Sequence, residues 1–529
     1  MLRGARLCRV LLIIAVGTYA GVFVSLTVSR HECLGSNIFD LGIFDQAVWL
    51  LSRGAIPYVT TRGLNIFADH FDPILVLLAP LYWLWDDVRV LLILQSCALA
   101  LGALPLYRLG ELRLGSCGWA LLLAAVYLLY PPVQWMNLCD FHPDALATPL
   151  LLTALWLLEV RRTALFLVVM GLVLLCKENM ALVVIPIGLT AWFAGDRRSG
   201  AMTVGMGVGG LSLAMATLRW LNHGTPSPYF GLYAAYGGSV TAIALHMLMH
   251  PLQLLRDLTS EVNKDYLGAL LWPVMLLPLA APQWLLVAAP ALFCNMLSSR
   301  PGMHTPYFQY NAAIIPILFR AAIEGIREMR LMFPAHNGRF PLADIGMACV
   351  LAAGGVYAVG HEPLSPGSTP YCGRPLSSAQ AAAARRALAV IAPDASVSAQ
   401  GTVGAQLAHR KRLYIFPNPF QRCAFGGDRL ALAQVEGFGF RPLPTADIRK
   451  RLAASDVEYV VLGPPKTSIY PLLPNDYEYF VRMMLADPHY AVVAVEGGVV
   501  VFKRGADRVG ALLDKARVIY PDGGSTSAR

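Results

Sequence analysis

The chain has 529 residues, of which 56% are hydrophobic and 14% are charged, and its mean hydropathy is +0.54. Soluble domains carry roughly 25% charged residues, so this composition excludes an ordinary soluble protein. Several stretches stay apolar for about 18 residues or more, enough to cross a hydrocarbon core of about 30 Å. The net charge of +9 does not indicate nucleic-acid binding, because the arginines gather at the ends of apolar stretches, where they set topology. We therefore expect a protein embedded in a membrane, with no nucleic-acid partner.

Hydropathy predicts about eleven transmembrane helices within residues 1–358. With a cytoplasmic N-terminus, every arginine cluster of this region falls in a cytoplasmic turn, as the positive-inside rule requires. The clusters are Arg108 with Arg113, Arg161 with Arg162, Arg197 with Arg198, and Arg327 with Arg330. The predicted spans are 10–28, 88–107, 117–131, 143–160, 163–176, 179–194, 201–220, 266–280, 283–297, 310–323 and 341–358.

The same topology places the unusual polar residues outside the cytoplasm. The predicted outer segments are 29–87, 132–142, 221–265, 298–309 and the tail from 359 onward. In these segments, or at the span ends beside them, lie Asp40, Asp45, His70, Asp72, Asp140, His142, Asp144, Lys177, Glu178, His304 and Tyr310. We therefore expect the functional site on the outer face.

The first outer loop, residues 29–87, begins with a predicted amphipathic helix in the membrane interface. Its apolar stripe has the 3, 4, 3 spacing of a helix face and consists of Leu41, Phe44, Val48 and Leu51. Asp40 lies where this helix begins, either as an N-cap or as a catalytic carboxylate. Asp45 lies away from the stripe, either on a solvated face or as a second acid. Gly54 ends the helix.

Two further acid–histidine–proline segments begin apolar runs. In the first, His70 precedes Asp72-Pro73, a good helix start, and the run 73–85 is too short to cross a membrane. In the second, Asp140 and His142 alternate with Asp144. Together with Asp69, His70 or Asp72, these oxygen and imidazole groups would suit a divalent cation, Mg²⁺ or Mn²⁺, but helix capping produces the same pattern. No other cofactor is indicated.

Cations and aromatic residues supply the remaining candidates. Lys177 and Glu178 interrupt the apolar stretch 164–194 and form either a solvated turn or a phosphate contact. His304 and Tyr310 lie at the outer start of a span, where they belong either to an aromatic belt or to a sugar or phosphate pocket.

The tail, residues 359–529, changes from apolar helices to a small α/β domain. Segments rich in β-branched and aromatic residues predict strands. They are ASVSAQ, RLYIFP, DVEYVVLG, YAVVAVEG and VVVFKR, and RRALAVIAP and YEYFVRMMLA read as helices. Cys372 and Cys423 form a disulfide bond only if this domain faces an oxidising compartment. The final GGSTSAR is typical of a disordered end.

Several of these motifs together resemble a known family. The segments FDLGIFDQAVW, HFDPILVLLAPLY, FHPDALATPLLLTALWLL, KEN and YNAAIIPILF closely resemble the bacterial membrane proteins grouped as domain of unknown function 2079. The resemblance covers most of the chain and implies a bacterial inner (cytoplasmic) membrane protein. That family in turn resembles type-C glycosyltransferases, which are multi-span enzymes that use polyprenyl-phosphate sugars.

The wider resemblance implies roles for particular residues. In the lipid A aminoarabinose transferases, an acidic motif precedes a helix, a glycine and a KPP-type segment, an order that Asp40, Gly54 and HFDP repeat here. Asp40 then takes the position of the catalytic acid, and His70 lies near that of the phosphate-binding lysine. The sequence departs from this pattern because Leu41 follows Asp40 and no KPP is present.

Taken together, these features predict a type-C glycosyltransferase-like membrane protein. It would move a sugar from a polyprenyl-phosphate donor to an extracytoplasmic glycan, lipid or protein acceptor, with inversion. Asp40 would act as base with help from Asp45, while Lys177, His70 and His304 would hold the phosphate. One alternative is a transporter or flippase of a lipid-linked or small polar substrate, and another is a non-catalytic envelope scaffold.

Overall fold

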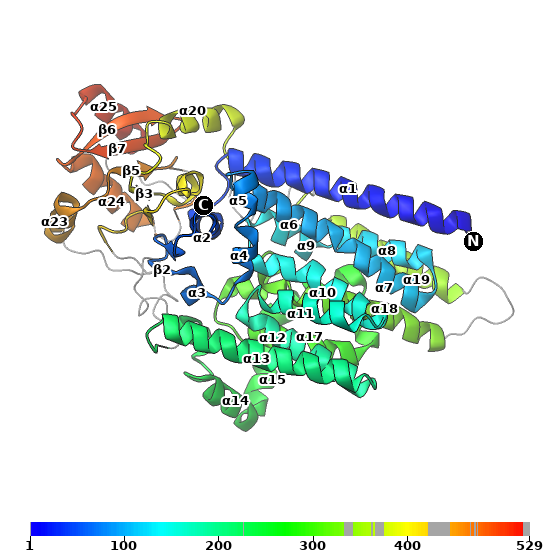
Figure 1. Ribbon diagram of the computed structural model, residues 1–529. Helices are drawn as coiled ribbons and strands as arrows, with labels where there is room; N and C mark the ends of the chain where they lie inside the picture. Colours follow the sequence, from blue (N-terminus) through cyan, green and yellow to red (C-terminus); the bar gives the residue numbers. More distant parts are fainter. Residues whose placement is uncertain are drawn as a thin grey trace. The chain divides into compact units, whose positions relative to one another are not determined.

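The computed structural model describes residues 2–521 except 226, 333–341, 361–362, 365–374, 422–444, 466, 470–471 and 473. The chain divides into two compact units (Figure 1). Unit 1 contains residues 1–27, 70–74 and 91–371, and unit 2 contains residues 28–69, 75–90 and 372–529. The first outer loop and the tail therefore belong largely to the same unit.

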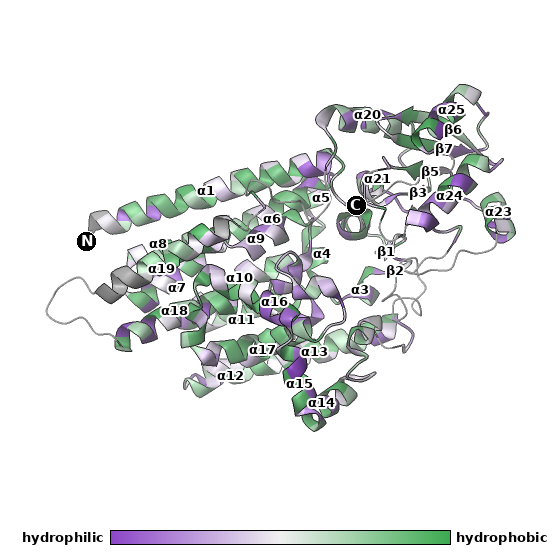
Figure 2. Ribbon diagram, turned by 180° about the vertical axis from the view of Figure 1, so that it is seen from behind, coloured by the Kyte–Doolittle hydropathy of each residue, from purple (hydrophilic) through white to green (hydrophobic). Residues whose placement is uncertain are grey.

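Unit 1 is helical. Most of its helices are strongly apolar, as the composition predicts, and hydrophobic residues also cover the outer faces of α1 and α13 (Figure 2). Its longer helices, with the ends of α1 and α6 shared with unit 2, are α1 (Leu2–Glu32), α6 (Arg89–Leu101), α7 (Ala103–Leu114), α8 (Cys117–Leu128), α9 (Pro131–Leu138), α10 (Pro143–Glu159), α11 (Thr163–Leu174), α12 (Ala181–Phe193), α13 (Arg197–Leu221), α14 (Val240–Met249), α15 (Pro251–Leu258), α16 (Glu261–Leu271), α17 (Pro282–Met296), α18 (Ile314–Met332) and α19 (Leu342–Val359).

Three helices within the described residues are long and apolar enough to cross a membrane by themselves. They are Gly4–Glu32, Arg89–Leu114 and Arg197–Leu221, and the bent pair α8 and α9 makes a fourth if it counts as one span. The membrane character is thus supported by helix length and composition, while the number of eleven spans stays a prediction.

One predicted span is wrong as a continuous helix. Within 266–280, α16 ends at Leu271, and two 3₁₀ turns follow, at Trp272–Val274 and Leu277–Ala280. Pro273 removes a backbone donor, and Met275 and Leu276 adopt positive φ angles of 50° and 57°. The helix therefore breaks at this point.

Ion pairs gather where α7 and α10 end, against the middle of α18. Arg113 contacts Glu324 at 2.7 Å and Glu159 at 3.0 Å, and Arg320 contacts Glu159 at 3.1 Å. The opposite end of α10 carries Asp144. Since α10 has 17 residues, its two ends are about 25 Å apart, at about 1.5 Å per residue. Unit 1 thus keeps two separate groups of polar side chains at the two ends of one helix.

Unit 2 is built on a five-stranded sheet of order β4-β3-β5-β7-β6 (Figure 1). The strands are β3 (Val397–Ala399), β4 (Leu413–Ile415), β5 (Tyr459–Leu462), β6 (Tyr490–Glu496) and β7 (Val499–Arg504). β3 pairs in parallel with β4 and β5, whereas β7 is antiparallel to β5 and β6. All five strands expected in the tail are confirmed.

Alternation along the strands gives this sheet two buried faces. Tyr459 and Val461 face one core together with α20 (Ser378–Leu388), and Val460 and Leu462 face the other. The second core packs on α23 (Thr445–Ala454), α24 (Pro474–Ala486) and α25 (Gly510–Ile519). Helices thus cover both faces. The expected end segment GGSTSAR, Cys372 and Cys423 lie outside the described residues.

The first outer loop joins the first of these cores through Leu34 and Ile38, both fully buried. The loop contains a five-residue π-helix η1 (Ile38–Gly42), α2 (Ile43–Ser52), β1 (Tyr58–Val59), β2 (Leu64–Asn65), α3 (Ile66–Asp69), α4 (Ile74–Leu78) and α5 (Leu81–Leu84). The run 73–85 forms two short helices that begin after Pro73, as predicted, and Gly54 follows α2 with a φ of +66°.

Candidate functional site

Asp40 does not cap the first loop helix. Asn37 occupies the N-cap of η1, and its side chain accepts a hydrogen bond from the Phe39 backbone N–H at 2.9 Å. Asp40 lies inside η1 and is half-buried. The capping interpretation of Asp40 is therefore wrong. The carboxylate retains a partly exposed position, which a base that acts on an entering substrate needs.

Asp45 is not on a solvated face, since its exposed fraction is 1%. The tail of the chain covers the polar side of α2, where Gln46 donates to the Arg410 carbonyl and Asp45 contacts His409. The Asp45 Oδ1 atom accepts hydrogen bonds from Tyr82 Oη at 2.6 Å and from His409 Nε2 at 2.8 Å. Burial first, and then the Asp45 charge, raise the pKa of Tyr82 well above its usual value, so the phenol stays a neutral donor.

His409 lies between two carboxylates. Its Nε2 faces Asp45, and its Nδ1 lies 3.3 Å from Asp86 Oδ1. Because a carboxylate only accepts hydrogen bonds, Nε2 carries a proton, and the second carboxylate beside Nδ1 favours the imidazolium form of the ring. Burial lowers the pKa of His409, but the charge and hydrogen bond of Asp45, with Asp86 behind them, outweigh it, so the pKa lies above its usual value.

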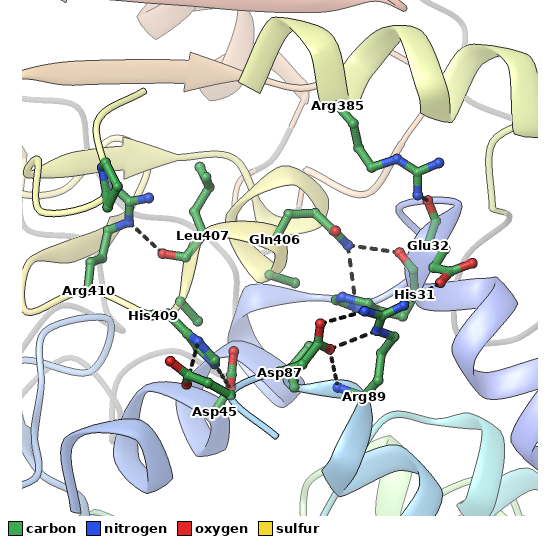
Figure 3. Close-up of a pocket in the computed structure, with 15 residues that line it drawn as sticks. His31, Glu32, Asp45, Asp87, Arg89, Arg385, Gln406, Leu407, His409 and Arg410 are labelled. Atoms are coloured by element: carbon green, nitrogen blue, oxygen red, sulfur yellow. Dashed lines mark hydrogen bonds and ion pairs between the residues drawn. The ribbon is translucent and has the colours of Figure 1, made fainter. Parts of the chain in front are cut away.

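This carboxylate–histidine group borders a cavity of about 440 Å³ (Figure 3). The cavity lies within unit 2, between the first outer loop and the segment Ala405–Arg410 that follows α21 (Gly401–Gly404). The ionisable residues of its lining are His31, Glu32, Asp45, Asp86, Asp87, Arg89, Arg385, His409 and Arg410. Asp40 is not among the residues that line it.

A second buried ion pair in unit 2 fixes the β1–β2 turn. Arg62 contacts Asp69 through two hydrogen bonds of 2.8 Å, and their exposed fractions are 2% and 8%. The Arg62 guanidinium also lies 5.6 Å from the centre of the Phe39 ring, beside Asp40. Asp69 was predicted as a possible ligand of the divalent cation, but in the structure it pairs with Arg62.

In unit 1, the predicted outer turns bring two ion pairs to one end of the helices. Lys177 Nζ lies 3.1 Å from Asp144 Oδ1, and His70 Nδ1 lies 2.8 Å from Glu178 Oε1. Glu178 also accepts the backbone N–H of Phe71 at 2.9 Å. The KEN segment therefore lies against both acid–histidine–proline segments.

Aromatic rings and an arginine extend this group. The Tyr229 ring stacks on His70 at 4.3 Å between centroids, and the Arg300 guanidinium lies 5.8 Å from the centre of the same ring. Arg300 Nη1 also donates to Tyr310 Oη at 3.0 Å. Two cations, Lys177 and Arg300, thus belong with the His70 imidazole to a set of linked contacts that we call the cation cluster. Its members are His70, Asp144, Lys177, Glu178, Tyr229, Arg300 and Tyr310.

The other candidates have mainly structural contacts. His304 Nδ1 lies 2.9 Å from Asn263 Oδ1, and its Nε2 lies 2.6 Å from the Ser298 carbonyl. Asp140 has a positive φ of 65°, and its carbonyl accepts a hydrogen bond from Gln95 at 2.8 Å. His142 occupies the N-cap of α10 without a side-chain cap bond.

Neither these residues nor the buried Asp72 form a recognisable metal site. Over the described ranges, no three His, Cys, Asp or Glu residues group as metal ligands would. The divalent cation therefore stays an untested prediction.

Sequence reasoning missed His409, Asp86, Tyr229 and Arg300. Tyr229 and Arg300 lie in predicted outer segments, so the predicted topology could have identified them as candidates. His409 gave no local signal, because its partner Asp45 is 364 residues away in the chain.

Comparison with known proteins places the chain in a family. No curated protein matches it. Among solved structures, ArnT from Cupriavidus metallidurans bound to undecaprenyl phosphate has 13% identity and a TM-score of 0.46, covering 93% of this chain and 97% of that one. The apo state of ArnT from the same organism has 13% identity and a TM-score of 0.43, covering 92% and 98%. Likenesses this low assign neither fold nor activity. Residues 30–432, about three quarters of the chain, match the family described as "Predicted membrane protein (DUF2079)", and the chain belongs to that family.

Proposed function

We propose that this protein is a membrane glycosyltransferase that transfers a sugar from a polyprenyl-phosphate donor to an acceptor on the outer side of the bacterial inner membrane. In this proposal the N-terminus is cytoplasmic and unit 2 is extracytoplasmic. The observation that carries it is the cation cluster, in which Lys177, His70 and Arg300 meet at one end of the apolar helices. An anionic lipid headgroup at that end would meet positive charge and aromatic rings together.

A lipid-linked donor suits this location. A leaving polyprenyl phosphate carries negative charge that needs cations rather than a general acid. The two ion pairs of the cluster hold Lys177 and His70 in place, so the donors are preorganised before the lipid arrives. His304 is a weaker candidate for this contact, because both of its ring nitrogens already face protein oxygens.

Asp40 is our candidate for the base. In the proposed step, its carboxylate accepts the proton of an acceptor hydroxyl while that oxygen attacks the anomeric carbon. The bond from this carbon to the phosphate oxygen breaks, and polyprenyl phosphate leaves with the electron pair. A single displacement inverts the anomeric centre. The burial and contacts of Asp45 favour a supporting role, in which it holds Tyr82 and His409.

The alternatives make different demands on the structure. Transporters commonly carry polar residues near the bilayer midplane on broken helices. Here the two polar groups at the ends of α10 lie about 25 Å apart, at about 1.5 Å per residue over its 17 residues. A scaffold would require no particular acid at position 40. The polar groups thus lie at the ends of the helix rather than near its middle. This arrangement favours a site at one membrane face, as the transferase needs, over a midplane transport site.

Donor use tests the proposal. Purified protein would be incubated with a panel of polyprenyl-phosphate sugars and a mixture of envelope acceptors, and released polyprenyl phosphate would be measured. The double variant Lys177→Gln with Asp144→Asn removes both charges of one pair and leaves no buried unpaired ion. We expect it to raise the KM for the donor about tenfold or more, the effect of losing a charged hydrogen bond.

Lys264→Gln is the matched control, because Lys264 is 57% exposed and, within the described residues, forms an ion pair only with the exposed Glu261. It should leave the KM unchanged. Release of polyprenyl phosphate by the double variant at the wild-type KM would contradict the assignment of the cation cluster to the donor.

A further inference from the structure

We propose that the unit 2 cavity is a binding site for a neutral, hydroxyl-rich ligand, namely a carbohydrate. The cavity volume of about 440 Å³ falls in the range of roughly 300–1,000 Å³ that small-molecule sites occupy. Every structural element that forms it belongs to unit 2, so the site is complete within one compact unit.

The lining mixes charged side chains with apolar ones such as Val88 and Leu407, whereas a site for a lipid tail is lined predominantly by apolar side chains. Hydrogen-bond acceptors are supplied by Glu32, Asp86 and Asp87, and donors by Arg89 and Arg385. Figure 3 shows Glu32, Asp87, Arg89 and Arg385 around the same space, with Arg385 and Arg89 on the side of Glu32. A sugar hydroxyl both donates and accepts, so a row of hydroxyls complements such an alternating surface.

The balance of charge selects against ionic ligands. Arg89 contacts Asp87 at 2.7 Å and Glu32 at 2.9 Å, and the His409 ring lies between Asp45 and Asp86. The guanidinium of Arg410 is turned to backbone carbonyls, including that of Ala395 at 3.0 Å. The carboxylates of Glu32, Asp45, Asp86 and Asp87 stand against three arginines and His409, so the lining carries no large net charge. A neutral ligand suits such a lining better than a charged one.

Some contacts at the mouth are able to open for a ligand. Asp86 is about half exposed and lies 3.3 Å from His409 Nδ1, longer than the 2.8 Å contact from Nε2 to Asp45. A ligand hydroxyl that takes the place of Asp86 would accept from Nδ1 and donate to the released carboxylate. Arg385 is exposed and donates to the Glu32 carbonyl at 2.9 Å. Asp45 stays buried and keeps His409 oriented.

That this carbohydrate is part of the acceptor rests on the proposed glycosyltransferase function. The binding site itself does not, because sugar binding is measured without any donor. The cavity and the transfer reaction can therefore fail separately.

The test compares two neighbouring arginines of α20. Arg385 lines the cavity, whereas Arg386 points elsewhere and pairs with Glu496 at 2.9 Å. Full-length protein in lipid nanodiscs would be titrated with glucose, galactose, mannose and maltose, with glucose 6-phosphate and glucosamine as charged counterparts. Saturation-transfer NMR reports binding, and calorimetry gives the Kd. A site that hydrogen-bonds a hydroxyl also loses affinity for the deoxy analogue of its ligand.

We expect at least one neutral sugar to bind more tightly than its charged counterpart. Arg385→Ala should weaken that binding about tenfold or more, while Arg386→Ala should leave the Kd unchanged. Absence of binding by all four neutral sugars, preference for a charged probe, or equal loss in both variants would overturn the proposal. If binding follows the prediction and no donor is turned over by the wild type, the carbohydrate site stands and the glycosyltransferase does not.

Discussion

The hydrogen bond from Tyr82 to Asp45 gives a sharp test of how the first outer loop is held. Tyr82 is 2% exposed and donates at 2.6 Å to a carboxylate that is 1% exposed. Replacing it with phenylalanine keeps the ring and removes only the hydroxyl. A hydrogen bond to a charged group contributes about 1.5–3 kcal/mol, so Tyr82→Phe should lower the free energy of unfolding of unit 2 by that amount.

The partner's charge is then removed in a double-mutant cycle. In an Asp45→Asn background the same hydroxyl faces a neutral amide, and its loss should cost about 0.5–1.5 kcal/mol. Unfolding would be followed by urea denaturation of the detergent-solubilised protein, with proteolytic cleavage inside residues 445–521 as the readout. A cost of less than about 0.5 kcal/mol in the wild-type background, or the same cost in both backgrounds, would refute the claim that Tyr82 serves a buried charge.

Two further predictions concern stability. The raised pKa of His409 means that its contribution is fully present below the unfolded value of about 6.5 and is lost as the pH rises through the folded-state value. The unfolding midpoint of the wild type should therefore exceed that of His409→Gln by more at pH 6 than at pH 9. The same difference at both pH values would contradict a protonated His409 in the folded state. Gly325→Ala should lower the melting temperature, because the added Cβ would collide with the backbone carbonyl of Leu277. Gly205→Ala, whose Cβ meets nothing within 4 Å, should be neutral or stabilising, and equal effects in both variants would contradict the packing of α18.

Much of the fold follows from local patterns in the sequence. The strand segments of the tail were predictable because β-branched residues there face a core on both sides, as Val460 and Val461 do. The helices of unit 1 followed from long apolar runs. The exception, 266–280, has the composition of a span, and its break combines Pro273 with the positive φ angles of Met275 and Leu276. Composition reports burial, whereas a broken helix depends on φ angles that the composition does not fix.

The candidate site was predicted less completely, because its key contacts join distant parts of the chain. Asp45 has the helical position of a solvated residue, and its burial depends on His409, which the sequence separates from it by 364 positions. Asp40 has the residue type of a cap, but Asn37 precedes it and takes that role. In the cation cluster, Lys177 and His70 were found individually as polar residues in outer turns. The sequence did not show which residues they pair with, because these ion pairs form only when three separate turns pack together.

The central claim is that Asp40 is the base of a lipid-dependent glycosyl transfer. Its most direct test is the initial rate of polyprenyl-phosphate release by wild type, Asp40→Asn and the exposed control Asp514→Asn, each shown to insert and fold normally. We predict turnover by wild type and Asp514→Asn, and a loss of about 100-fold or more in Asp40→Asn, the usual contribution of a general base. Equal rates in all three proteins would contradict the role of Asp40, and no release from any donor by the wild type would contradict the transferase itself.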